Sequence, residues 1–183
     1  MKIGKVNFED KHFLKSLKKY LVESRPYSGF SDQMSEPFLK KTVKTFIKED
    51  LLECDYSSCF ISSEGENLYY LFCKKDEDKK SLDIVFAFPN TNLIKGNVFL
   101  SRWPFCFCHL LLDQLKQSGF EKIHGTIQRK NRENEYERAL NRFGRNMFDI
   151  ELIDGDMFKS VTGTKESLLK AYSKLIKIYK NKL

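Results

Sequence analysis

The sequence predicts a mixed α/β (α+β) protein in which helices flank a mixed central sheet. Two observations predict this class. Segments with apolar residues at helical spacing alternate with short runs rich in aromatic and β-branched residues, and a strand–helix–strand unit lies in the middle of the chain. The 183 residues are 41% hydrophobic and include 16 phenylalanines, which excludes a disordered chain. A chain of this size buries an adequate core without metals or disulfides.

The N-terminal third is expected to form one strand and two helices. Residues 2–8 alternate apolar and polar side chains, as a short strand does. Residues 9–25 carry apolar side chains at helical spacing, and Pro26 ends that helix because the residue before a proline disfavours helical geometry. A second amphipathic helix is predicted over residues 36–52, with a proline in its first turn.

The middle of the chain changes to strand periodicity and then returns to a helix. Three aromatic-rich runs predict an antiparallel meander, at residues 59–62, 68–74 and 82–88. The helix that follows runs from Ser101, a possible N-cap, to Gly119 at its C-terminal end, and it is too apolar to be a surface element. Because strand–helix–strand connections are right-handed crossovers between parallel strands, residues 82–88 and 121–128 are expected to be parallel neighbours.

The C-terminal third is expected to supply further strands and two helices. The elements in order are a strand at 121–128, a helix at 131–143, a strand at 147–153, its hairpin partner at 157–161 and a final helix. Thr164 is placed to cap the final helix. One side of that helix is expected to be apolar, formed by Leu168, Leu169, Tyr172, Leu175, Ile176 and Tyr179. We therefore expect a main domain over residues 1–160 and a basic amphipathic helix over 161–183.

The positive charge of the chain is concentrated at one end. The net charge is +7, and the last 23 residues hold six lysines against Glu166 alone. This distribution argues against nucleic acid as a partner of the whole domain, although the basic helix could touch an anionic surface. For that helix we expect a protein partner or self-association through its apolar side.

The cysteines and the apolar runs restrict the class of protein further. The five cysteines include no Cys-x-x-Cys pair, which indicates free thiols and no metal site. The longest nearly apolar run, Trp103 to Leu112, is about half of what a membrane span needs. The first residues, Met1 to Lys5, lack a signal-peptide apolar region. We therefore expect a cytoplasmic protein, located in the host cytoplasm or in the virion if its source is viral.

The order of elements from Leu82 to Gly144 resembles the GCN5-related N-acetyltransferase (GNAT) family. The residues that carry the resemblance are Phe88-Pro89 at a strand end, Ser118-Gly119-Phe120 before the next strand, Asn131 after it, and Phe143-Gly144 at the close of a helix. The resemblance implies that acetyl-CoA lies in a V-shaped opening between the strands at 82–88 and 121–128. It also implies that the pyrophosphate rests on the N-terminus of the helix between them, where the helix dipole favours an anion.

The resemblance places cofactor-binding positions at the strand end before that helix, in the loop that leads into it, and after the following strand. The pantetheine would bond to the strand backbone at Phe88, and the cofactor-binding candidates are Phe88, Lys95, Gly96, Arg102 and Asn131. The family loop reads (Gln/Arg)-x-x-Gly-x-(Gly/Ala), because small residues let backbone approach phosphate. Alignment on Gly96 puts Leu93 and Val98 at the first and last loop positions, which departs from that pattern. Lys95 and Arg102 then either reach a phosphate by charge or are solvated loop cations.

Three residues are candidates for acid–base chemistry, because acyl transfer to an amine requires a base and often an acid for the departing thiolate. Asp83, near the start of the central strand, is a candidate base or water-relay carboxylate, or otherwise a strand-end charge. His124 is a second candidate, or otherwise a core or edge histidine. In the family the acid is commonly a tyrosine, at a position that holds Leu140 here. Tyr136, one turn earlier, could replace it or simply pack on the sheet.

Two functions from different classes remain open from the sequence. The first is acyl-CoA-dependent N-acyl transfer, with acetyl-CoA as cofactor and an amine-bearing small molecule or protein as acceptor. The second is a GNAT-fold binding or structural module with a decayed cofactor site, such as a phage virion or assembly protein. Fold alone does not decide between them, because function depends on the site.

Overall fold

A computed structural model describes residues 2–23, 36–90, 103–128, 149–153 and 158–179 of the chain. These residues form a seven-stranded sheet with the strand order β1-β2-β3-β4-β5-β7-β6. The strands are β1 (Lys2–Lys5), β2 (Tyr56–Ile61), β3 (Asn67–Asp76), β4 (Ser81–Pro89), β5 (Lys122–Gln128), β6 (Asp149–Ile153) and β7 (Phe158–Thr164). The helices are α1 (Lys11–Glu23), α3 (Glu36–Phe46), the π-helical turn η1 (Ile47–Leu51), α4 (Trp103–Ser118) and α6 (Lys165–Tyr179).

The strand pairing confirms the predicted meander and the predicted crossover. Strands β2, β3 and β4 pair antiparallel in sequence order, and β1 joins them antiparallel at the edge. Strands β4 and β5 pair parallel, with α4 connecting them. Strand β7 pairs antiparallel with both β5 and β6, so it lies between them. The mixed α+β class predicted from the sequence is therefore confirmed.

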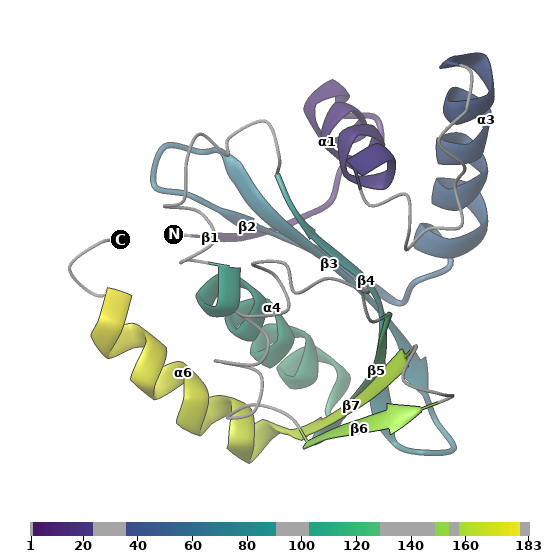
Figure 1. Ribbon diagram of the computed structural model, residues 1–183. Coiled ribbons are helices and arrows are strands. Elements are labelled where there is room, and N and C mark those ends of the chain that lie inside the picture. Colours follow the sequence, from purple (N-terminus) through teal and green to yellow (C-terminus); the bar gives the residue numbers. More distant parts are fainter. Residues whose placement is uncertain (1, 24–35, 91–102, 129–148, 154–157, 180–183) are drawn as a thin grey trace.

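The helices cover both faces of the sheet, as Figure 1 shows, with α1 and α3 on one side and α4 and α6 on the other. Alternation along each strand divides the buried side chains between two clusters. On the α4 side the cluster includes Leu71, Leu82, Ile123 and Val161 of the sheet. On the α1 side Tyr70, Phe72 and Phe88 pack against residues of α1, α3 and η1.

The last helix, α6, packs on α4 through part of the side that the sequence predicted to be apolar. Leu168, Ala171 and Leu175 are buried in the cluster that includes α4. Leu169 and Ile176 are 48% and 38% exposed, so the expectation that they share the packed side is wrong. The reason is geometric: the contact with one neighbouring helix buries a narrower stripe than the full apolar arc of a helical wheel.

Helix ends follow the capping residues seen in the sequence. Thr164 and Ser167 cap α6 reciprocally, with each side-chain oxygen accepting a hydrogen bond from the other residue's backbone N–H at 3.1 Å. Gly119 ends α4 with φ of +75°, and its N–H bonds to the Leu115 carbonyl. The predicted Ser101 cap and the predicted helix at residues 131–143 lie outside the described residues. None of the helices in the described parts of the chain has the length and apolar character needed to cross a membrane.

Candidate functional site

The parallel strands β4 and β5 separate part-way along their length. They are paired from Ser81↔Lys122 to Ile84↔Gly125, whereas β4 continues to Pro89 beside β3 and β5 continues beside β7. The separation coincides with a β-bulge, because Phe72 of β3 pairs with Phe86 while the next residue, Cys73, pairs with Ile84. Val85 is the extra residue of that bulge. A bulge bends its strand and increases its twist, which turns the end of β4 away from β5.

A chain of polar side chains crosses the sheet just before this separation. Asp83 and His124 are register partners on β4 and β5, and Asp83 Oδ1 lies 3.7 Å from His124 Nδ1. The other ring nitrogen, His124 Nε2, lies 3.3 Å from Ser160 Oγ on β7. Ser81 donates a hydrogen bond of 3.2 Å to Asp83 Oδ1. The structure thus connects an imidazole to a carboxylate on one side and to a hydroxyl on the other.

This polar chain lies on the face of the sheet that α1 and α3 share. The neighbours of Asp83 and His124 along their strands, Leu82 and Ile123, point into the cluster on the α4 side. Side chains alternate along a strand, so Asp83 and His124 point the other way. Both remain about one-third exposed, with relative side-chain exposures of 33% and 32%. A substrate in solution can therefore reach the pair.

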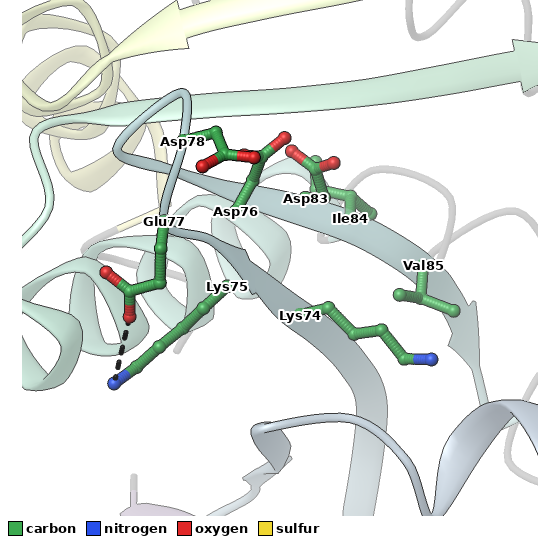
Figure 2. A pocket seen from close by; sticks show the side chains of 8 residues that line it. All are labelled: Lys74, Lys75, Asp76, Glu77, Asp78, Asp83, Ile84 and Val85. Atoms are coloured by element: carbon green, nitrogen blue, oxygen red, sulfur yellow. Dashed lines mark ion pairs between the residues drawn. The ribbon is translucent and has the colours of Figure 1, made fainter.

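An open depression of about 620 Å³ adjoins Asp83 and the bulge. Its lining includes Ile84 and Val85 together with two lysines and four carboxylates, namely Lys74, Lys75, Asp76, Glu77, Asp78 and Asp83. Figure 2 shows the carboxylates of Asp76, Asp78 and Asp83 gathered on one side of it. Lys75 pairs with Glu77 at 3.9 Å, and Lys79 pairs with Asp76 at 2.8 Å and lowers the pKa of that carboxyl through the hydrogen bond.

The structure brings together two of the three predicted catalytic residues. Asp83 and His124, predicted separately, are neighbours, whereas Tyr136 lies outside the described residues. Two residues of the polar chain, Ser160 and Ser81, were not among those predicted from the sequence. The alternation Ser160-Val161-Thr162 did signal a polar strand face, but its position beside His124 depends on a pairing between residues 36 positions apart.

Of the predicted cofactor-binding residues, Phe88 is the one that the structure describes. Its side chain is fully buried among aromatic rings of the α1-side cluster, so any cofactor contact would come from its backbone. Lys95, Gly96, Arg102 and Asn131 lie outside the described residues. Next to β4, the buried Asn90 joins the strand end to its surroundings: it accepts a hydrogen bond from Ser16 of α1 and donates one to the Asn67 carbonyl at 2.7 Å.

Two features around β4 bear on the acyl-CoA that the resemblance implies. The parallel strands separate beyond Ile84 and Gly125, and α4 begins at Trp103 in the crossover between these strands. The helix start also limits phosphate binding, because Pro104 has no backbone N–H to donate. The first turn of α4 therefore offers a phosphate fewer backbone donors than an N-terminal turn without proline does.

The cysteines behave as buried apolar residues. Cys73, Cys106 and Cys108 are buried, and burial raises the pKa of Cys108 to about 12. Burial also raises the pKa of Cys54 to about 11. A protonated thiol is a poor nucleophile and a poor metal ligand. Within the described residues, no group of three or more His, Cys, Asp or Glu side chains could hold a metal ion.

Comparison with solved structures identifies the architecture. The chain matches a spermidine N-acetyltransferase from Vibrio cholerae with a TM-score of 0.60 and 9% identity, over 92% of this chain and 98% of the other. The chain has the GNAT fold. It also matches a GNAT-family acetyltransferase from Bacillus anthracis with a TM-score of 0.53 and 16% identity, over 90% and 94% of the two chains.

A third match was crystallised with the cofactor. An aminoglycoside 6'-N-acetyltransferase complexed with coenzyme A matches with a TM-score of 0.56 and 8% identity, over 90% of this chain and 97% of the other. No protein-family model matches the sequence, and no curated protein matches it. The likeness to the GNAT fold is therefore one of structure, and the part of the suggesting order that the structure describes, from β4 through α4 to β5, is confirmed.

Proposed function

We propose that this protein is an N-acyltransferase that transfers an acyl group from acyl-CoA to a cationic amine. The observation that carries the proposal is the Asp83–His124 pair, which stands where the parallel strands β4 and β5 separate. A base at that position lies beside the space in which the GNAT fold holds its cofactor. The pair is accessible from the face that carries the acidic depression.

The chemistry divides between the cofactor and the chain. When bound, acyl-CoA would supply the acyl group as a thioester to an unprotonated amine, and coenzyme A would leave as a thiolate that takes a proton from the solvent. His124 takes up the proton that the amine loses, and the Asp83 carboxylate stabilises the resulting imidazolium. Ser81 holds the carboxylate through a hydrogen bond to Oδ1. The backbone of β4 beyond Val85 would hold the pantetheine arm.

The depression supports a positively charged acceptor. Its lining holds four carboxylates against two lysines, and Lys79 pairs with Asp76 from outside the lining. The small net negative charge that is left beside Asp83 favours an ammonium group of the acceptor other than the amine that reacts. Two of the matched proteins are by name acetyltransferases of spermidine and of an aminoglycoside, and both of these acceptors carry several amines. A polyamine is therefore the first acceptor to test, and acetyl-CoA is the first donor.

The experiment combines binding and turnover. Acetyl-CoA is titrated into the protein by calorimetry, and coenzyme A release is then followed with polyamines and aminoglycosides as acceptors. Replacement of His124→Asn should lower kcat about 10²- to 10⁴-fold, the usual contribution of a general base. Thr162→Ala is the matched control, because Thr162 is the register partner of His124 and is exposed. Acetyl-CoA binding without turnover, or equal rates for both variants, would contradict the proposed chemistry.

A further inference from the structure

The hydrogen bond between Ser160 and His124 is not needed to satisfy buried polar groups, because neither side chain is buried. Ser160 Oγ lies 3.3 Å from His124 Nε2, and both side chains are partly exposed. Elsewhere on this face of β7, Thr162 is exposed, although it is the direct register partner of His124. The hydroxyl that contacts the ring therefore belongs to Ser160, the diagonal neighbour of His124. It contacts Nε2, the ring nitrogen that faces away from Asp83.

The surroundings of the ring select one tautomer. A neutral imidazole carries hydrogen on one nitrogen and accepts with the other. Nδ1 lies 3.7 Å from the Asp83 carboxylate oxygen, so a lone pair at Nδ1 would be repelled, whereas an N–H there is attracted. Nε2 is then the acceptor, and the Ser160 hydroxyl donates to it.

We infer that Ser160 is the residue that positions His124 for catalysis and passes the acceptor's proton to it. This inference rests on the proposed function, since it assigns the path by which the amine loses its proton. In one step the amine N–H bond breaks as an O–H bond forms at Ser160 Oγ. In the same step the original Oγ–H bond breaks as an N–H bond forms at His124 Nε2. Atoms and charge balance, with the positive charge ending on the imidazolium beside Asp83.

The charged and titratable groups around His124 are consistent with this path. Asp83 on β4 faces Nδ1, and Ser81 bonds that carboxylate rather than the ring. On β7 the neighbouring side chains, Ser160 and Thr162, are uncharged. The nearest other charges by register are Lys122, two residues before His124 on β5, and Glu151 of β6, the register partner of Ser160. Among the described contacts of the ring, Ser160 is the group that bonds Nε2.

The first arm of the test reads the tautomer without any substrate. Long-range ¹H–¹⁵N spectra of the ¹⁵N-labelled full chain, at a pH where the ring is neutral, show which nitrogen carries hydrogen. The chain has 3 histidines, and the signals that His124→Asn removes identify the one of interest. We expect the Nδ1–H tautomer in the wild type and in Ser160→Thr, which keeps the hydroxyl. In Ser160→Ala we expect the same tautomer, because Asp83 sets it, but a shifted Nε2 resonance, because that nitrogen loses its hydrogen-bond donor.

The second arm reads catalysis. Ser160→Ala should lower kcat about tenfold or more with an unchanged KM for acetyl-CoA, because one hydrogen bond to the base is lost. Ser160→Thr should restore most of the rate, and Thr162→Ala should leave both the rate and the spectrum unchanged. An unaltered His124 spectrum in Ser160→Ala, or full activity in that variant, would overturn the inference. A shifted spectrum in a protein that acylates none of the amines would support the positioning role of Ser160 and refute the proposed function.

Discussion

Replacing Phe88 with alanine should be among the most destabilising single changes in the protein. The side chain is fully buried, and its ring lies 4.9 Å from Tyr70, 5.4 Å from Phe86, 6.0 Å from Phe13 and 6.3 Å from Phe72, measured between centroids. Truncation removes all four contacts and leaves a cavity between α1 and β4. Buried Phe→Ala changes cost about 3–5 kcal/mol, and the number of ring partners places this one near the upper end.

The assay is urea unfolding followed by far-UV circular dichroism. Phe38→Ala is the matched control, because the same truncation on α3 removes a ring that is 54% exposed. Its cost should be within about 0.5 kcal/mol of zero. Phe88→Leu should retain much of the stability and, if only the backbone contacts the cofactor, acetyl-CoA binding as well. A loss for Phe88→Ala no larger than for Phe38→Ala would show that the aromatic cluster does not hold β4.

Two further predictions concern the strand junction and the contact between α4 and α6. Gly125→Val should destabilise the fold by about 1–3 kcal/mol in the same urea assay, because a Cβ there would lie 3.2 Å from Ile84 Cβ and 3.3 Å from Val161 Cγ2. An unchanged free energy of unfolding would mean that the strands shift to make space without losing stability, and would contradict this reasoning. His109 lies 2.5 Å from the Tyr172 hydroxyl, and burial lowers its pKa below the ordinary value of 6.5. As the pH falls, His109 is protonated in the unfolded chain before it is protonated in the folded protein, so the free energy of unfolding should decrease as the pH drops through 6.5. His109→Asn should lack this part of the pH dependence. Parallel curves of stability against pH for the two proteins would contradict the prediction.

The parts of the fold that sequence could predict depend on local signals. Period-2 runs and turn residues located the meander, and the capping residues Thr164 and Gly119 located two helix ends. The crossover from β4 to β5 followed from handedness, which holds for almost any strand–helix–strand unit. Each of these inferences used either residues close in sequence or the handedness rule, which holds for nearly all strand–helix–strand units.

The parts that sequence could not predict depend on long-range register. Residues 157–161 were expected to pair with the preceding strand, and nothing in their composition indicated that the observed strand, β7, also lies beside β5. Asp83 and His124 were each considered without the other, because their pairing requires a crossover of 41 positions to close in one particular register. Ser160 enters the site only once both pairings are known.

The bulge at Val85 explains how β4 contributes side chains to both hydrophobic clusters and also carries Asp83 of the candidate site. Before the bulge, Leu82 and Ile84 face α4; after it, Ala87 faces α4 while Phe86 and Phe88 face α1. In a regular strand Ile84, Phe86 and Phe88 would share one face, so the α1-side cluster would lose two of its rings. The extra residue shifts the alternation and separates β4 from β5 at the same point. The aromatic core under α1 and the separation of β4 from β5 beside the Asp83–His124 pair are therefore consequences of a single extra residue.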